Sequence, residues 1–271
     1  MIVTGGTFGI GRSITLSLAA RGYRVVAFGL ESRQLSSTAE RAIPGLEAEL
    51  ARQGLEADLL HADVASAADV DRVRAHTVSR YGRVDGLVNN AAVGPLGTVL
   101  DTTEADFERI VAVNLKGPYL MARAVLPTMI SQGGGRIVNI GSGAGYGKHN
   151  MAVYSASKAG LHGLTMALAY DHFHQHIGVN LVIPGGGGIV TGMSLGRAGG
   201  IGTGSPDEVA RMRATAPGTV AGRPAEGDDV ANAVAFLLSP EAEALSGTVI
   251  DVGCFAHQGG PLRAAPVPVE G

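Results

Sequence analysis

The sequence predicts an α/β fold in which a parallel sheet of about seven strands lies between layers of helices. Short apolar runs alternate with amphipathic stretches along most of the 271 residues. Most of these runs are continuously apolar, which is typical of parallel strands that are buried on both faces. Strands and helices that alternate in this way indicate a single doubly wound domain of the Rossmann type, whose ligand lies at the carboxyl ends of the strands.

The first half of the chain supplies four of the expected strands, each a short apolar run. Residues 1–3 form the first strand and lead through a glycine-rich turn into a helix over 12–21. The next strands cover 24–28, 55–61 and 86–88, and the helical stretches between them include 47–53 and 67–81. This regular alternation is what a parallel sheet requires, because each parallel pair needs a crossover connection.

The second half continues the pattern, with one exception. Helical stretches are expected over 105–130, 153–174 and 228–238, and strands over 136–140, 179–183 and 248–252. Residues 185–204 contain ten glycines and few large side chains, so they cannot form regular sheet. We therefore expect one dinucleotide-binding domain over 1–258, with a mobile substrate loop over about 185–220. The proline-containing tail over 259–271 is expected to be flexible.

Composition excludes several classes of protein. The net charge of −3 gives no electrostatic reason to expect nucleic acid or an anionic membrane as a partner. The chain holds one cysteine, Cys254, which excludes an internal disulfide and fits a reducing compartment. It has no apolar run of 18 residues that could span a bilayer. These features predict a soluble, cytoplasmic protein.

A glycine-rich turn, Thr4 to Gly11, lies between the first strand and the first helix. Glycines allow the backbone to turn tightly and to approach a pyrophosphate, which the positive end of the following helix would bind. A glycine cluster alone is weak evidence, but its position between a strand and a helix strengthens it. The cofactor contacts expected here are Gly5, Thr7, Phe8, Gly9, Ile10 and Gly11.

Polar residues also follow the third and fourth strands, where strand ends converge on a bound dinucleotide. Asp63, beside Val64, could accept a hydrogen bond from an adenine amino group. The amide of Asn90 could anchor the adjoining backbone. Either residue could instead only cap the segment that follows it.

Tyr154 and Lys158 are spaced at i and i+4, so they lie on one face of a helix. A phenol with an ordinary pKa of about 10 is a poor base at neutral pH. A neighbouring ammonium stabilises the phenolate, which is what proton exchange with an alcohol requires. The alternative is a partly buried tyrosine beside a solvated lysine on an ordinary helix.

Two further residues favour the catalytic interpretation. Ser142 follows the fifth strand at the same edge of the sheet, where its hydroxyl can hold a substrate oxygen against the tyrosine. Asn114 is a polar residue inside an otherwise apolar helical stretch, although asparagine is a mediocre helix former. Its amide could hold a water against Lys158 as a proton relay.

The order of these motifs along the chain resembles the short-chain dehydrogenase/reductase family. The shared motifs run from the glycine turn through Asp63, Asn89-Asn90-Ala91, Asn114, Ser142, Tyr154-x-x-x-Lys158 and Pro184-Gly185. The resemblance implies a catalytic tetrad of Asn114, Ser142, Tyr154 and Lys158. It also implies that Lys158 binds the nicotinamide ribose, that Ile189 and Thr191 lie near the carboxamide, and that the protein is a homotetramer or homodimer.

The end of the second strand bears on the choice of cofactor. An acidic residue there would bind the ribose hydroxyls of NAD, whereas arginine would favour the 2′-phosphate of NADP. Gly29 occupies the acidic position, and the usual basic positions hold Phe8 and Leu30. We therefore expect NAD, with NADP as the alternative. His172 and His176 have metal-ligand spacing, but the sequence offers no third ligand, so no metal is expected.

The predicted function is hydride transfer between a nicotinamide cofactor and a secondary alcohol or ketone, with Tyr154 as the acid–base group. An alternative is an NADPH-dependent reductase of acyl-thioester or related carbonyls. A third is a catalytically silent dinucleotide-binding sensor, but such proteins usually lose the tyrosine or the lysine. The expected partner is a small-molecule substrate.

Overall fold

The structure, a computed structural model, describes residues 1–30, 42–185, 189, 207, 210, 214 and 219–253. In these residues seven strands form one sheet in the order β3-β2-β1-β4-β5-β6-β7, and every neighbouring pair is parallel. The strands are β1 (Ile2–Thr4), β2 (Val26–Gly29), β3 (Asp58–His61), β4 (Gly86–Asn89), β5 (Gly135–Ile140), β6 (Ile177–Ile183) and β7 (Val249–Asp251). The strand order reverses between β1 and β4, which confirms the predicted doubly wound sheet and marks its switch point.

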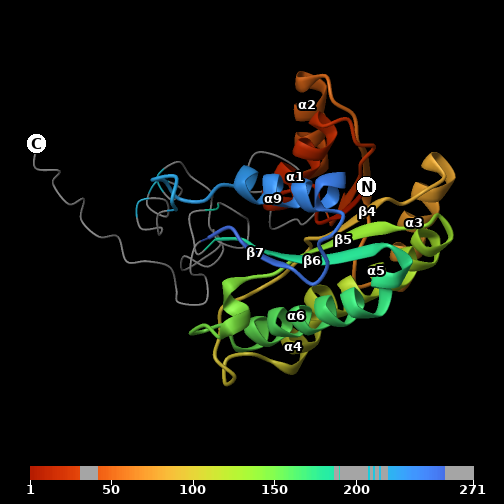
Figure 1. Cartoon of the computed structure of the whole chain (residues 1–271). Helices are drawn as coiled ribbons and strands as arrows, with labels where there is room; N and C mark the ends of the chain where they lie inside the picture. The colour runs from red at the N-terminus through yellow and green to blue at the C-terminus, as the bar shows by residue number, and fades with distance from the viewer. Residues whose placement is uncertain are drawn as a thin grey trace, which may run out of the picture.

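Helices cover both faces of the sheet (Figure 1). One face carries α1 (Gly9–Ala20), α2 (Ala42–Gln53) and α9 (Gly227–Leu238). The other carries α3 (Ala67–Tyr81), α4 (Glu104–Val111), α5 (Gly117–Ser131) and α6 (Ala152–His172). Shorter helical turns are the π-helical η1 (Ala112–Lys116) and the 3-10 segments η2 (Gly143–Tyr146), η3 (Phe173–Gln175) and η4 (Pro240–Ala242).

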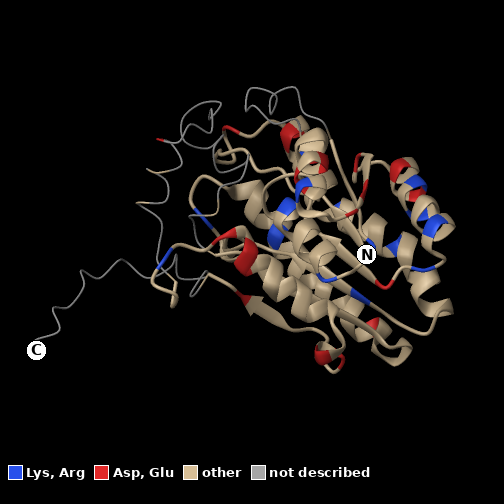
Figure 2. Ribbon diagram, turned by 90° about the horizontal axis from the view of Figure 1, so that it is seen from above, with Lys and Arg blue, Asp and Glu red and all other residues tan. Residues whose placement is uncertain are grey.

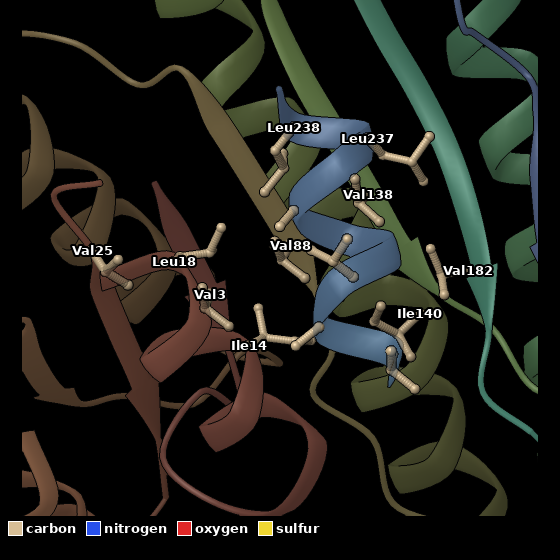
Figure 3. Packing of buried hydrophobic residues seen from close by; sticks show 14 of the residues in the cluster. Val3, Ile14, Leu18, Val25, Val88, Val138, Ile140, Val182, Leu237 and Leu238 are labelled. Carbon is tan, nitrogen blue, oxygen red and sulfur yellow. The ribbon is translucent and has the colours of Figure 1, made fainter. Parts of the chain in front are cut away.

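Two apolar clusters hold these layers together, one on each face of the sheet. Successive strand side chains point to opposite faces, so Val3 and Val138 join the cluster under α1 and α9, whereas Ile2 and Ile137 join the cluster under α3 and α5. Figure 3 shows the first cluster between the strands and the two helices. Burial on both faces explains why the strands are continuously apolar in the sequence.

Helices α1 and α9 pack side by side although they lie at opposite ends of the described chain (Figure 3). Ile14 and Leu18 of α1 belong to the same buried cluster as Leu237 and Leu238 of α9. At the edge of this contact the Arg21 guanidinium donates a 2.8 Å hydrogen bond to the Asn232 side chain. The helix that begins at the glycine turn is therefore held in place by the last helix of the described fold.

The observed elements differ from the predicted ones mainly at their ends. The first helix begins at Gly9 instead of residue 12, and β3 begins at Asp58 instead of residue 55. The helical stretch predicted over 105–130 consists of α4, η1 and α5. Most of the predicted loop over 185–220, and the whole predicted tail over 259–271, lie outside the described residues.

Acidic and basic residues are interspersed along the ribbon in Figure 2. Helix α3 illustrates this, since Asp69 and Arg72 form an ion pair one turn apart on its surface. Over the described ranges, no helix is both long and apolar enough to cross a bilayer.

Candidate active site

The predicted site residues that the structure describes gather at the carboxyl edge of the sheet. The glycine turn follows β1, Leu30 follows β2, Asp63 follows β3, Asn90 follows β4 and Ser142 follows β5. Helix α6, which packs on one face of the sheet, follows η2 and carries Tyr154 and Lys158 near its beginning. Because all the strands are parallel, one edge of the sheet collects residues that are far apart in the sequence.

The glycine turn has a backbone that other residues could not adopt without strain. Gly5 and Gly9 have φ values of +59° and +54°, in the left-handed region that favours glycine. Gly11 is constrained by space instead, because a Cβ atom there would lie 1.9 Å from the Gly5 carbonyl oxygen. The turn therefore brings bare backbone to the start of α1, where Phe8 at the N-cap provides no side-chain hydrogen bond to the helix.

Asn90 holds this turn in position. Its side-chain amide donates to the carbonyl oxygens of Thr4 and Gly5, at 3.1 and 3.0 Å. In return, the Thr4 hydroxyl oxygen accepts hydrogen bonds from the backbone N–H groups of Asn90 and Ala91, at 3.0 and 2.9 Å. The anchoring interpretation of Asn90 therefore agrees with its contacts, and the pairing of Asn90 with Thr4 was not predicted from the sequence.

Asp63 and Val64 make mainly structural contacts. One carboxylate oxygen of Asp63 accepts a 2.9 Å hydrogen bond from the Ala65 N–H, which is the capping alternative weighed from the sequence. The Val64 side chain is buried against Gly117 of α5, where an added Cβ would lie 2.9 Å away. Only the backbone of Val64 is left to contact a ligand. Leu30, by contrast, is half exposed at the end of β2.

Tyr154 and Lys158 are both buried on α6. The Lys158 ammonium lies 5.9 Å from the centre of the Tyr154 ring and donates a 2.8 Å hydrogen bond to the carbonyl oxygen of Ile140. Lys158 is only 2% exposed. Burial disfavours the charged form, and it lowers the pKa of Lys158 from 10.5 to about 8. A solvated lysine on an ordinary helix surface, the alternative weighed from the sequence, does not match this environment.

Ser142 is the N-cap of η2, directly after β5. Its hydroxyl oxygen accepts a hydrogen bond from the Ala144 N–H at 3.2 Å. That contact uses the oxygen as an acceptor and leaves the hydroxyl hydrogen to be donated elsewhere. Met151 and Ala144 pack with Tyr154 in a small buried cluster, which ties η2 to the start of α6.

The side chain of Asn114 bonds to two other segments of the protein. Its amide nitrogen donates to the Val93 carbonyl oxygen at 2.8 Å and to the Ser157 hydroxyl at 3.1 Å, and its oxygen accepts from the Val93 N–H at 2.8 Å. Both amide hydrogens are therefore used. These contacts do not support the prediction that the amide holds a water against Lys158, and they show that it fixes the segment after β4 to α6.

The backbone around Asn114 suggests a different role. Residues 112–116 form a π-helical turn in which the Gly117 N–H bonds to the carbonyl of Ala112, five residues back. Pro118 has no N–H, so the carbonyl of Asn114, four residues before it, lacks its α-helical donor. Single π turns are frequent at functional sites because they rearrange backbone groups in this way.

The last two predicted cofactor contacts, and the pair of histidines with metal-ligand spacing, remain to be placed. The Ile189 side chain is buried in the apolar cluster under α1 and α9, whereas Thr191 lies outside the described residues. His172 and His176 do not act as a pair here, since the ring of His172 is hydrogen-bonded to Gln175 at 2.7 Å. No cluster of three or more potential metal ligands forms within the described part of the chain.

Comparison of the sequence with known protein families identifies the family of this chain. The family model described as short chain dehydrogenase matches residues 1–198. The chain belongs to the short-chain dehydrogenase family.

Relatives of this dehydrogenase cover it almost completely. An uncharacterized oxidoreductase of Thermotoga maritima is 34% identical over 93% of the chain and 94% of the relative. The 2-(S)-hydroxypropyl-CoM dehydrogenase 3 of Xanthobacter autotrophicus is 36% identical over 95% and 94%. The crystal structure of levodione reductase superposes with a TM-score of 0.81 at 29% identity, covering 95% of this chain and 96% of that one. The protein is therefore a nicotinamide-dependent oxidoreductase that acts on alcohol or carbonyl groups of small molecules.

The residues of this dehydrogenase fit a bound dinucleotide. The positive-φ glycines and the uncapped start of α1 provide backbone N–H groups for a pyrophosphate. The Lys158 ammonium has three N–H donors, and among the described residues only the Ile140 carbonyl is bonded to it. Two donors are left for hydroxyl groups such as those of a ribose.

Sequence reasoning missed three buried residues that support this site. Ser157 bridges the Asn114 amide and the Tyr154 carbonyl oxygen, which it contacts at 2.8 Å. Asn139 and Thr165 are both fully buried and bond to each other at 2.9 Å. The available signal for Asn139 was a polar residue inside the apolar strand Ile137-Val138-Asn139-Ile140.

Proposed function

We propose that Tyr154 is the acid–base group of this oxidoreductase, that Lys158 and Ser142 act with it, and that Asn114 contributes through its backbone. The observation that carries the proposal is the buried pair on α6, in which the Lys158 ammonium faces the Tyr154 ring at 5.9 Å. The pair lies at the sheet edge where ligands of this fold bind. Burial lowers the pKa of Lys158. Ionisable groups whose pKa values are strongly shifted in this way are concentrated at functional sites.

The proposed roles follow from which polar atoms are left to act. In reduction, the Tyr154 hydroxyl donates its proton to the carbonyl oxygen of the substrate, and in oxidation it accepts that proton back. Ser142 donates its hydroxyl hydrogen to the same substrate oxygen, since its own oxygen is bonded to the Ala144 N–H. When bound, the nicotinamide ring supplies the hydride for reduction and accepts it in oxidation.

Lys158 has two roles in this proposal. Its charge favours the phenolate form of Tyr154 during proton transfer, and its remaining donors hold the cofactor ribose and a proton-relay water. The Asn114 carbonyl, which has no α-helical donor because of Pro118, is the acceptor proposed for that water. Asn114 therefore remains in the proposed tetrad, with its carbonyl in place of its amide.

Replacing Tyr154 with phenylalanine tests the proposal directly. The variant should fold and bind cofactor, because only the hydroxyl is removed, but its kcat should fall by roughly 10²–10⁴, the range for general acid–base catalysis. Turnover would be measured with a panel of secondary alcohols and ketones, and cofactor binding by fluorescence titration. A variant with nearly normal turnover would refute the role of Tyr154.

We propose NAD as the preferred cofactor, with the glycine turn, Asp63, Val64 and Asn90 contributing to its site. Phe8 and Leu30 offer no charge to a 2′-phosphate. We expect a higher kcat/KM with NAD(H) than with NADP(H), and Leu30→Arg should shift the preference toward NADP(H). A wild-type preference for NADP(H) would contradict the proposal.

Acyl-thioester carbonyls are the second candidate substrate class. A 3-oxoacyl-(acyl-carrier-protein) reductase of Staphylococcus epidermidis is 34% identical to this chain over 93% of its length. Adding 3-oxoacyl thioesters to the panel of ketones separates the two classes. A kcat/KM for thioesters that exceeds the value for every simple ketone would favour the second class.

We also propose that the protein is a cytoplasmic homotetramer or homodimer. The exposed side of α6 supports self-association, since Ala156, Ala159, Gly163 and Met166 leave it uncharged over several turns. Sedimentation equilibrium would measure the oligomeric state, and a monomer at micromolar concentration would exclude the proposal.

A further inference from the structure

One side of helix α6 carries the catalytic pair and also a buried threonine. Tyr154, Lys158, Leu161 and Thr165 follow one another at intervals of four, three and four residues, so they lie on the same side of the helix. All four are buried. Whatever fixes the rotation of this side about the helix axis also fixes the direction of Tyr154 and Lys158.

Two polar contacts join this side of α6 to consecutive residues of β5. The Lys158 ammonium bonds to the carbonyl oxygen of Ile140 at 2.8 Å. Two helical turns further on, the Asn139 amide donates to the Thr165 hydroxyl oxygen at 2.9 Å. Apolar contacts are non-directional and allow a helix to slide or rotate slightly, whereas hydrogen bonds require a defined geometry.

Asn139 is itself fixed from the other side. Its partner in the register of β4 is Asn89, whose amide donates to the Asn139 side-chain oxygen at 2.8 Å. The Thr165 hydroxyl donates in turn to the Leu161 carbonyl oxygen at 2.7 Å. A continuous buried chain of hydrogen bonds therefore runs from β4 through β5 to α6.

We infer that Asn139 and Thr165 are positioning residues, which set the rotation of α6 and so direct Tyr154 and Lys158 at the substrate. This inference rests on the proposed function of that pair. The Thr165 hydroxyl is not needed to form the helix itself, because α6 extends from Ala152 to His172 on both sides of the contact. Their contribution lies in geometry, to which catalysis is far more sensitive than folding.

The central test compares two isosteric replacements. Thr165→Val keeps the shape of the side chain but removes both hydrogen bonds of the hydroxyl. Thr77→Val is the matched control, because the Thr77 hydroxyl of α3 is equally buried and makes the same kind of bond, to the Val73 carbonyl, without a tie to the sheet. Thr165→Ser retains the hydroxyl and should rescue the function of the valine variant.

We expect Thr165→Val to lower kcat by roughly tenfold or more with little change in KM, since a small misplacement of a catalytic group has this effect. Thr77→Val and Thr165→Ser should stay within about twofold of the wild type, by the same reasoning. The alkaline limb of the kcat–pH profile should also move to higher pH in Thr165→Val alone. A loosened helix exposes Lys158, and solvation raises the pKa of an ammonium that burial had lowered.

A second pair of variants tests Asn139 in the same way. Asn139→Leu removes the link between β4 and α6. Asn180→Leu removes an equally buried asparagine of β6, whose side chain bonds, within the described part of the chain, to the backbone of Leu245 and Thr248. Both should lose stability in urea, but only Asn139→Leu should lose kcat and shift the pH profile. If either variant does not fold, the threonine comparison decides.

Equal kcat values and identical pH profiles for Thr165→Val and Thr77→Val would overturn the inference. This outcome differs from a failure of the proposed function. If Tyr154→Phe turns over normally, the catalytic role of the pair is refuted whatever Thr165→Val shows. If Tyr154→Phe is inactive while Thr165→Val matches its control, the pair is catalytic and its positioning lies elsewhere.

Discussion

The two halves of the sheet edge are organised by opposite means. The nucleotide half consists of β1 to β3 with the glycine turn. It depends on glycines, because at Gly5, Gly11 and Gly29 the surrounding atoms leave no room for a Cβ atom. In the catalytic half, β4 to β6 with η1 and α6, it depends on buried polar side chains such as Asn114, Asn139 and Lys158. Added atoms should therefore destabilise the first half, and lost polar atoms should impair catalysis in the second.

The largest effect is expected from Gly11→Ala in the nucleotide half. The new methyl group would lie 1.9 Å from the Gly5 carbonyl oxygen and 2.5 Å from the Asn90 amide nitrogen, two atoms that are hydrogen-bonded to each other. Overpacking against fixed backbone should cost about 3 kcal/mol of stability or more. Urea unfolding and cofactor titration would measure the loss, and a fully stable variant that binds cofactor would show that the turn is not rigid.

Lys158→Met should have the opposite effect on stability while it abolishes turnover. Burial that lowers the pKa of Lys158 from 10.5 to about 8 corresponds to about 3 kcal/mol of destabilisation. Losing the bond to the Ile140 carbonyl offsets about 1 kcal/mol of the gain. The variant without cofactor should therefore be more stable than the wild type by about 2 kcal/mol at neutral pH.

The stability difference between the wild type and Lys158→Met should depend on pH. The folded protein releases the Lys158 proton near pH 8 and the unfolded chain near pH 10.5, so between these values the unfolded state binds more protons. The wild type should then gain stability as pH rises through this window, and the advantage of Lys158→Met should disappear. A constant difference between the two proteins from pH 7 to 10.5 would mean that Lys158 is not buried as an ammonium.

The smallest effect is expected from Gly82→Ala, outside both halves of the site. Gly82 ends α3 with φ +73°, but a Cβ there meets no atom within 4 Å. Only backbone strain remains, which should cost about 1 kcal/mol. Cofactor affinity and kcat should be unchanged, which makes this variant the control for Gly11→Ala. A change in either would mean that the end of α3 is coupled to the site.

The same contrast explains which parts of the site could be predicted. The glycine turn and the Tyr154–Lys158 pair were predictable because each is local, within eight residues and one helical turn respectively. The partners of Asn114 were not, since Val93 and Ser157 lie 21 and 43 residues away. Tertiary contacts determine the hydrogen-bond partners of buried polar side chains, and neither residue propensity nor sequence spacing predicts those contacts.

The sheet was predicted for a related reason. A strand that is buried on both faces must be apolar throughout, so β1, β2, β4, β5 and β6 are visible as apolar runs. The start of β3 was misplaced because Leu55 and Ala57 pack on the apolar cluster without joining the strand. Hydrophobic patterns report burial, and here burial extends beyond the hydrogen-bonded strand.

The contact between α1 and α9 has a consequence for how the protein is made. The helix that follows the glycine turn is synthesised before α9, yet its apolar side is covered by residues near position 238, and Arg21 bonds to Asn232 across 211 residues of sequence. Closing a loop of this length slows folding, because its entropy is lost before its contacts form. On the ribosome, the apolar side of α1 stays uncovered until α9 has been synthesised, which is the state in which a nascent chain aggregates or recruits chaperones.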